Sequence, residues 1–224
     1  MKKQILVLIV GISVFVSCAN TEEKAPFASI VEIVGIDSVS FKKLIGMDLQ
    51  ACTYWWKNHL VVFGVFEDAA ETHRQISEIC PDATVRLYDK PFYVFDRSGC
   101  DNSAQVERWS HTVMTANLVA DLDLQQEYMD YHDRQAELFP EVALGFCRAD
   151  FQQLLLFRNG RQLMLVISIP EGESLDELDP KTTENNPRVN EWNKIMAKYQ
   201  EGVEGTEPDE VWVVLEDAIS YFEQ

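Results

Sequence analysis

Residues 152–169 read QQLLLFRNGRQLMLVISI, two apolar runs on either side of a short polar turn. The runs Gln152–Phe157 and Gln162–Ile169 have the length and composition of buried strands. Between them, Asn159 and Gly160 can adopt the positive φ angles that a two-residue turn requires. The stretch therefore predicts an antiparallel β-hairpin in the interior of the fold.

Upstream of the hairpin, the sequence predicts a strand followed by a helix. Residues Arg108–Leu118 are rich in strand-forming side chains, and residues Asp121–Leu138 carry a helical pattern. Asp123, with Gln126 three residues later, fits a capping box at the start of this helix.

Downstream of the hairpin, the sequence predicts a second helix and a fourth strand. Asn186 and Pro187 are typical of a helix N-terminus. Apolar side chains then recur at intervals of three and four and form one helix face: Val189, Trp192, Met196 and Tyr199. The strand Val211–Leu215 closes the unit. The polar residues 172–187 have the composition of a surface insertion.

The first half of the chain resembles the second. Residues 82–96, DATVRLYDKPFYVFD, and residues 209–223, DEVWVVLEDAISYFE, both give a β-rich run, an acidic turn and an aromatic ending. Residues 59–68 and 162–171 match in the same relative order. A β-α-β-β-α-β order is the split β-α-β, or ferredoxin-like, pattern. The sequence therefore predicts an α+β fold of two ferredoxin-like units that form an intramolecular, dimer-like α/β barrel.

The N-terminus has the features of an export signal. Two lysines precede a short apolar run, and the small residue Ser17 stands directly before Cys18. This pattern resembles a bacterial lipoprotein signal in residues 1–17, with Cys18 lipidated; an ordinary secretory signal is the alternative. We expect an exported lipoprotein in the periplasm or on the cell surface, held to the membrane by its lipid anchor only.

The rest of the chain divides by composition. Residues 18–27 are a polar tether, residues 28–97 a degenerate ferredoxin-like repeat, and residues 107–224 the complete second unit. The linker around residues 96–107 is rich in Gly, Ser, Asn and Asp, which break both neighbouring patterns.

Charge and cysteine content limit the possible partners and states. The chain has 37 Asp and Glu against 19 Lys and Arg, a net charge of −18. Nucleic acid is excluded as a partner, because binding it requires Lys and Arg against the phosphates. Four cysteines lie beyond Cys18 and allow three disulfide connectivities, with free thiols equally compatible: Cys52, Cys80, Cys100 and Cys147.

The chemistry that remains is acid–base chemistry by side chains. The sequence has no phosphate-binding loop, G-x-S-x-G elbow or H-E-x-x-H motif, so we expect no cofactor and no metal. Tyr128 and His132 are four residues apart and share one helix face. A histidine exchanges protons near neutral pH, and a neighbouring hydroxyl can orient a sugar-like substrate. The same spacing also fits two packing residues.

Short motifs in the second half occur in a characteristic order: Tyr128-x-x-x-His132, Phe139-Pro140-Glu141, the hairpin end Gly160-Arg161-Gln162-Leu163-Met164, and Trp192-x-x-x-Met196. Together they resemble the L-rhamnose mutarotase family over about residues 107–224. The resemblance implies a ferredoxin-like unit, usually paired as a dimer. It also implies interconversion of the α and β anomers of a deoxy sugar without a cofactor.

The resemblance assigns roles position by position. His132 would be the proton donor and Tyr128 a sugar-contacting hydroxyl. Trp192 matches the first of two adjacent sugar-binding tryptophans and would cover the apolar face of the sugar. Asn193 stands where the second tryptophan is expected, and Gln153 where a sugar-contacting tyrosine is expected; both could hydrogen-bond hydroxyl groups.

The aromatic-Pro-Glu element and the first half also depart from the family pattern. Phe139 stands in place of a tryptophan, and Glu141 is a candidate partner carboxylate. In the first half, residues 37–46, DSVSFKKLIG, take the place of the catalytic helix and contain neither Tyr nor His. Trp55 and Trp56 precede a strand and are predicted to pack.

We therefore expect one sugar site per chain and a monomer whose first half replaces a second subunit. The ligand would be a monosaccharide. Two alternatives use the same fold: a non-catalytic carbohydrate-binding lipoprotein, and a ferredoxin-like barrel acting on an unrelated small molecule.

Overall fold

The first half of the protein forms a four-stranded unit with two helices. The computed structural model describes residues 28–219 except 48 and 50. Its first elements are β1 (Ser29–Val34), α1 (Ser38–Ile45), β2 (Cys52–Trp56), β3 (His59–Gly64), α2 (Ala69–Ile79) and β4 (Thr84–Tyr88). The strands pair antiparallel in the order β4-β1-β3-β2, which is ferredoxin-like topology.

The second half repeats this topology with a larger helical layer. Its elements are β6 (Trp109–Leu118), α3 (Leu122–Asp133), α4 (Gln135–Leu138), α5 (Pro140–Arg148), β7 (Gln153–Asn159), β8 (Gln162–Pro170), α6 (Leu175–Leu178), α7 (Pro180–Thr183), α8 (Pro187–Met196), β9 (Gln200–Glu201) and β10 (Val213–Asp217). The strand order is β10-β6-β8-β7, with β9 on the end of β6. The β7–β8 hairpin is confirmed, and Gly160 in its turn has φ +60°.

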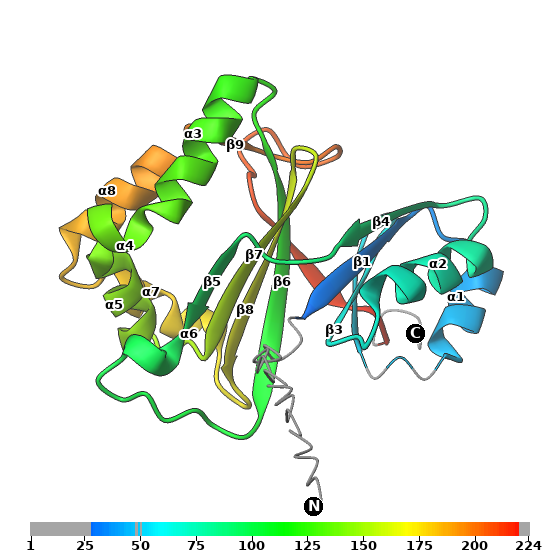
Figure 1. The fold of residues 1–224 in the computed structure, drawn as a ribbon, viewed down its shortest axis with the longest axis horizontal. Helices are drawn as coiled ribbons and strands as arrows, with labels where there is room; N and C mark the ends of the chain where they lie inside the picture. The colour runs from blue at the N-terminus through cyan, green and yellow to red at the C-terminus, as the bar shows by residue number, and fades with distance from the viewer. Residues whose placement is uncertain (1–27, 48, 50, 220–224) are drawn as a thin grey trace, which may run out of the picture.

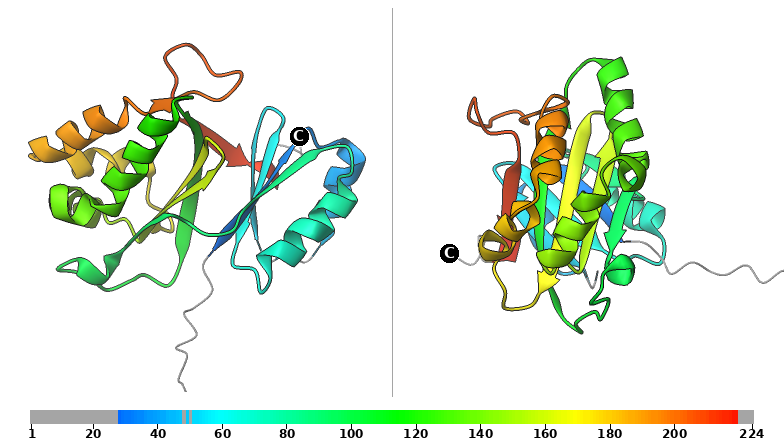
Figure 2. Two further views of the ribbon diagram at one scale, coloured as in Figure 1. Left: turned by 45° about the horizontal axis from the view of Figure 1, so that its top comes forward. Right: turned by 90° about the vertical axis from the view of Figure 1, so that its left-hand side faces the viewer.

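The two units join into one curled ten-stranded sheet. β10 pairs with β2, and β5 (Tyr93–Asp96) pairs with the free edge of β7. The helices α1 and α2 cover the outer face of the first unit, and α3–α8 cover the outer face of the second (Figures 1 and 2). The inner faces enclose a shared apolar core that includes Tyr54, Phe63 and Phe157. This confirms the predicted α+β fold of two ferredoxin-like units.

The boundary between the units lies earlier in the chain than composition suggested. The sequence placed residues 93–96 in the first unit, but β5 hydrogen-bonds β7, with Tyr93 opposite Leu156. An uncovered β7 would present a row of unpaired N–H and C=O groups, and β5 satisfies them. The short 3-10 helix Arg97–Gly99 follows directly.

Two local expectations in the helical layer were wrong. The N-cap of α3 is Asp121, whose carboxylate accepts from the backbone N–H groups of Asp123 and Leu124. Residues 172–187 are not a mere surface insertion, because they form α6 and α7 and bury Leu178. α7 lies so close to α5 that a Cβ on Gly145 would meet the Thr182 carbonyl oxygen at 2.6 Å.

Tryptophan packing and the cysteine pairing are also settled. Trp56 packs against the shared core and Trp55 against the cluster under α1 and α2, as predicted. Cys100 and Cys147 form a disulfide that ties the segment after β5 to α5. Cys52 and Cys80 are free thiols.

The expected signal segment, the lipidated Cys18 and the tether lie outside the described residues. In the part of the chain that the structure describes, no helix has the length and apolar character needed to span a membrane.

Candidate functional site

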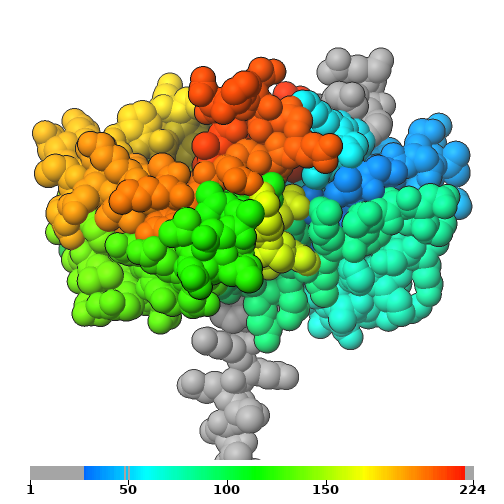
Figure 3. Space-filling model, turned by 90° about the horizontal axis from the view of Figure 1, so that it is seen from above, coloured from blue at the N-terminus to red at the C-terminus, as the bar shows by residue number. Residues whose placement is uncertain are grey.

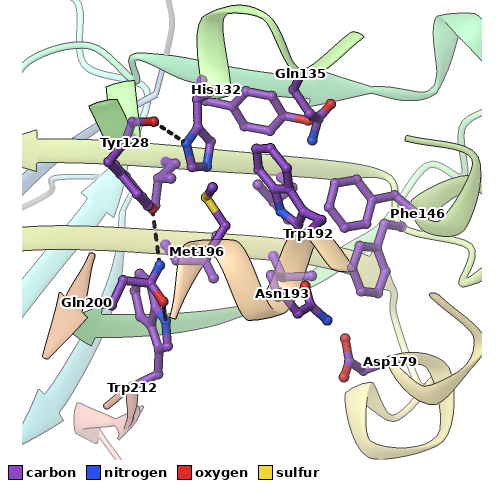
Figure 4. Close-up of a pocket in the computed structure, with 16 residues that line it drawn as sticks. Tyr128, His132, Gln135, Phe146, Asp179, Trp192, Asn193, Met196, Gln200 and Trp212 are labelled. Carbon is purple, nitrogen blue, oxygen red and sulfur yellow. Dashed lines mark hydrogen bonds between the residues drawn. The ribbon is translucent and has the colours of Figure 1, made fainter. Parts of the chain in front are cut away.

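A cavity of about 330 Å³ lies between the helical layer and the outer face of the second sheet (Figure 4). α3 and α8 form one wall, and the outward-facing side chains of β7 and β8 form its floor. Its lining combines aromatic, aliphatic and a few polar side chains: Tyr93, Tyr128, His132, Gln135, Phe146, Phe151, Leu154, Leu156, Leu165, Ile167, Asp179, Trp192, Asn193, Met196, Gln200 and Trp212. A mostly apolar pocket with a few convergent polar groups is typical of a small-molecule site.

The helix α3 brings Tyr128 and His132 to the cavity together. Asp121 fixes the start of the helix, and the two residues lie one turn apart on its buried face. Their ring centroids are 4.3 Å apart. Both side chains line the cavity, so the predicted pair does reach a common space.

The environment of His132 fixes which ring nitrogen can act on a ligand. Nδ1 lies 3.0 Å from the carbonyl oxygen of Tyr128, and because a carbonyl only accepts, Nδ1 donates the hydrogen bond. Burial lowers the pKa of His132 to about 4, against a smaller opposing effect of that hydrogen bond. The imidazole is therefore neutral at pH 7, and Nε2 carries a lone pair.

Aromatic rings produce this burial of His132. Trp192, Phe92 and Tyr93 meet the imidazole edge-on, with centroid distances of 5.1, 5.6 and 5.4 Å. Phe139 lies against the far side of Trp192 at 5.4 Å. The rings displace water from the histidine and disfavour its charged form.

The hydroxyl of Tyr128 is held as a hydrogen-bond donor. Its oxygen accepts from Nε2 of Gln200 at 3.3 Å, which leaves the hydroxyl proton for another acceptor. Burial raises the pKa of Tyr128 well above its ordinary value. The phenol therefore stays protonated and can donate to a ligand oxygen without giving up its proton.

The far end of the cavity combines apolar and polar groups. Figure 4 shows Asn193 and Asp179 on the side away from Tyr128, next to Phe146. Burial raises the pKa of Asp179. Near His132, Gln135 accepts a hydrogen bond from the Tyr93 hydroxyl at 3.0 Å.

Four of the six predicted substrate-site residues line this cavity: Tyr128, His132, Trp192 and Asn193. Gln153 does not, because alternate residues of a strand face opposite sides of the sheet. Leu154 and Leu156 of β7 face the cavity, so Gln153 belongs to the barrel side.

Glu141 is not part of the cavity lining either. One oxygen of its carboxylate lies 3.8 Å from Nε of Arg188, and its backbone carbonyl accepts from Asn186. The N-terminal turn of α5 thus places this carboxylate against α8, outside the cavity lining, and it is not a partner of His132.

Sequence reasoning missed seven polar or aromatic residues of the cavity: Tyr93, Gln135, Phe146, Phe151, Asp179, Gln200 and Trp212. Gln135 follows His132 by three residues, a helical spacing that could have indicated it. Asp179 lies in the segment interpreted as an insertion. Gln200 is the first residue of the short strand β9, and Trp212 lies in the loop before β10. In the described part of the chain, no group of three or more His, Cys, Asp or Glu side chains is arranged to hold a metal ion.

Fold and cavity together define a class: a ferredoxin-like α+β protein with a neutral, buried histidine and a tyrosine hydroxyl facing a pocket for one small polar molecule. Within that class, a profile of the L-rhamnose mutarotase family matches residues 102–220, more than half of the chain. The protein belongs to the L-rhamnose mutarotase family.

Two curated proteins are similar to this chain, and the name of the first agrees with this assignment. An L-fucose mutarotase of Xanthomonas campestris is 29% identical over 93 residues, covering 41% of this chain and 72% of that protein. A UPF0734 protein of Dictyostelium discoideum is 29% identical over 92 residues, covering 39% and 67%. The family assignment supports, in general terms, the interconversion of sugar anomers by an isomerase.

A solved ferredoxin-fold protein from Listeria monocytogenes, related to antibiotic biosynthesis monooxygenases, superposes with a TM-score of 0.43. It is 10% identical and covers 86% of this chain and 96% of its own. The fold assignment here rests on the strand order of the protein itself.

Proposed function

We propose that this protein is a mutarotase that interconverts the α and β anomers of a deoxyhexose such as L-rhamnose. The observation that supports it most is the neutral imidazole of His132, which lines the same cavity as the Tyr128 hydroxyl and has its Nε2 lone pair free of the Nδ1 hydrogen bond. Ring opening requires a group that takes the proton of the anomeric hydroxyl and then gives it to the ring oxygen, which is the role of His132, and it benefits from a hydrogen-bond donor that polarises the sugar, which is the role of Tyr128.

In the proposed mechanism His132 takes one proton and gives one proton, so its protonation state is the same before and after ring opening. Nε2 of His132 takes the proton of the anomeric hydroxyl, and the electron pair left on that oxygen forms the carbonyl. The bond between the anomeric carbon and the ring oxygen breaks, and its electron pair stays on the ring oxygen. The imidazolium then gives its proton to the former ring oxygen, which was bonded to the anomeric carbon until this step and is therefore close to the proton that His132 took from the anomeric hydroxyl.

The free aldehyde rotates about its bond to the ring carbon and closes on its other face by the reverse steps. His132 thus begins as a proton acceptor and becomes the donor only after the first transfer, whereas the sequence comparison gave it the donor role first. Tyr128 donates a hydrogen bond to the sugar and polarises it. Positioned acid–base catalysis of this kind contributes about 10²–10⁴-fold.

The cavity suits a sugar with one apolar end. Trp192 offers a ring beside the histidine, while Phe146, Phe151 and Ile167 form an apolar region. A methyl group in place of a hydroxymethyl group would gain from burial there, since an apolar wall leaves a hydroxyl without a partner. Asn193 and Asp179 can hydrogen-bond ring hydroxyls.

The second candidate is a non-catalytic sugar-binding protein with the same pocket. One substitution favours it: Asn193 takes the place of a tryptophan in the wall of the cavity. A pocket with fewer aromatic walls holds the sugar less rigidly, and catalysis depends on that positioning more than binding does.

Exchange of anomers measured by proton NMR separates the two. Saturation of one anomeric signal passes to the other only when their exchange is fast, so we would add the full chain to L-rhamnose, L-fucose, D-galactose and D-glucose. We expect transfer with a 6-deoxy sugar and its loss in His132→Ala. His73→Gln is the matched control, because His73 lies on α2 in the other unit. Folded protein that binds a sugar but transfers no saturation would support the second candidate instead.

We also propose that the protein is an exported lipoprotein, anchored through Cys18, and a monomer. The sequence pattern at residues 1–18 supports the first point, and the filling of the second-subunit position by residues 29–88 supports the other. Cys18→Ser should release the protein from the membrane fraction, and light scattering should give the mass of one chain. Retention of Cys18→Ser, or a dimer mass, would contradict these proposals.

A further inference from the structure

A second cavity, of about 620 Å³, lies between the two units at the end of the barrel. Its walls come from both halves: β1, the β2–β3 turn and β4 on one side, and the β7–β8 turn and the loop after β9 on the other. That loop crosses toward the first unit, where Nζ of Lys57 donates to the carbonyl of Gly205 (Figure 3). The cavity therefore exists only because the first half is present.

A buried carboxylate organises this cavity. Glu32 on β1 is fully buried and lies 2.6 Å from Nδ1 of His59, 3.0 Å from Arg86 and 2.8 Å from the amide of Gln162. The Tyr88 hydroxyl donates to it as well, at 3.0 Å. These hydrogen bonds outweigh the effect of burial and hold the pKa of Glu32 below its ordinary value.

The carboxylate also orients His59 toward the cavity. Because Glu32 is ionised and accepts, Nδ1 of His59 carries the proton in this contact. His59 lines the cavity, so Nε2 is the ring atom left for a ligand. A carboxylate that fixes the ring in one orientation is a common arrangement in binding and catalytic sites.

The chemistry of the lining favours a neutral ligand. Arg86 is paired with Glu32, and Arg161 is paired with Glu201, so neither guanidinium carries an uncompensated charge. The remaining polar lining consists of the exposed carboxylate of Glu204, which disfavours anions, and of four amides: Asn58, Asn117, Asn159 and Gln162. The Gln162 amide is already bonded to Arg86, Glu32 and Thr115, so the three asparagines are the amides that face a ligand. Amides both donate and accept, which matches hydroxyl groups that do the same.

We propose that this cavity is a second ligand site, which binds a neutral polyhydroxyl molecule such as a monosaccharide or a cyclic polyol. His59 Nε2 and the surrounding amides hydrogen-bond its hydroxyls. The first half of the chain, which lacks the Tyr-His pair, thereby supplies the centre of a different site. This proposal does not depend on the proposed reaction, because His132 and Trp192 lie in the other cavity.

The test uses the imidazole signals of the full chain, which has 4 histidines. Each ring gives its own carbon–proton resonance, assigned from single His→Gln variants. We would titrate in L-rhamnose, L-fucose, D-glucose, myo-inositol and inorganic phosphate in turn. We expect at least one neutral probe to shift the His59 resonance, and to shift it equally in His132→Ala.

Asn58→Trp is the variant that should block the site. Asn58 is exposed in the β2–β3 turn, so a larger side chain there fills the cavity mouth without entering the core. Loss of one or two hydrogen bonds and of space should weaken the apparent affinity by about tenfold or more. Glu78→Ala, on the outer surface of α2, should leave the titration unchanged.

Four outcomes would overturn the proposal. The first is a His59 shift with phosphate but with none of the neutral probes, which would mark an anion site. The second is a neutral probe that shifts only His132, and the third is no shift of His59 with any probe. Loss of the His59 shift in His132→Ala would likewise assign the effect to the other cavity.

Discussion

The two halves of this chain share one topology and differ in how their helices meet the sheet. In the first half, α1 and α2 are 8 and 11 residues long and pack Phe41, Leu44 and Ile76 directly onto the strands. In the second half, the helices α3–α8 form a wider layer, and a cavity lies between that layer and the sheet. The difference shows that a ferredoxin-like unit acquires a pocket from its additional helical segments, whereas its strand order is the same with or without one.

The halves also differ in where they place ionisable groups. The second half buries His132 among aromatic rings, without a charged partner among them. The first half buries Glu32 within hydrogen-bonding groups from both units. The surroundings of His132 keep its imidazole neutral, so that it can act as a base. The surroundings of Glu32, where the two units meet, compensate the charge of its carboxylate.

The largest expected effect on stability comes from removing the Glu32 carboxylate, which lies where the two units meet. Glu32→Ala would leave His59 and Arg86 without their buried partner and should reduce the free energy of unfolding by about 3–5 kcal/mol. Glu32→Gln keeps the shape and some hydrogen bonds and should cost less. Urea unfolding measures both, with Glu78→Ala on the exposed face of α2 as control. A Glu32→Ala variant as stable as the wild type would show that the network does not hold the halves together.

The second prediction concerns the disulfide, which only the second half possesses. Replacing Cys100 and Cys147 by serine removes a link across 47 residues and should cost about 2–4 kcal/mol. Cys52→Ser, at an exposed free thiol of the first half, is the matched control and should change little. Equal stability of the two variants in thermal unfolding would contradict the prediction.

The third prediction concerns the stability that His132 contributes in the second half and how that stability depends on pH. His132 has a pKa of about 4 in the folded protein, and an unfolded histidine has one of about 6.5. The unfolded state therefore binds the proton first, and stability from His132 is complete above pH 6.5 and is lost as pH falls toward 4. The total is on the order of 3 kcal/mol.

The unfolding free energies of wild type and His132→Gln would be compared from pH 7.5 to about 4. The carboxylates titrate in both proteins, so the difference between the two free energies isolates the contribution of His132. The stability advantage of the neutral histidine should shrink over that range. The proposed exchange of sugar anomers should slow only as the pH approaches 4, because the neutral ring is the proposed proton acceptor. A constant difference in stability would mean that His132 titrates alike in both states.

The smallest expected effects on stability come from removing either of two equivalent helix caps. Asp37 caps α1 and Asp121 caps α3, each accepting two backbone N–H groups. Asp121→Ala should cost about 1 kcal/mol and also lower kcat, since α3 carries Tyr128 and His132. Asp37→Ala should destabilise without affecting kcat. A fall in kcat in Asp37→Ala, or none in Asp121→Ala, would place the active helix elsewhere.

The sequence alone was enough to predict those features that depend on interactions between near neighbours in the chain. The Asn159-Gly160 turn, the strands beside it and the apolar face of α8 follow from backbone sterics and side-chain spacing, which act between near neighbours. The same spacing placed Tyr128 and His132 on one helix face. The repeat of the pattern in both halves was enough to predict two ferredoxin-like units.

Only the tertiary structure decided which groups meet. The side of the sheet that Gln153 faces depends on strand register, where a shift of one residue reverses the outcome. The cavity also receives side chains from segments far from α3 in the sequence: Asp179, Gln200 and Trp212. Glu32 contacts Gln162, which lies 130 residues later in the sequence. The ionisation of His132 depends on the rings packed around it, because desolvation comes from neighbours in space and leaves no pattern in the sequence.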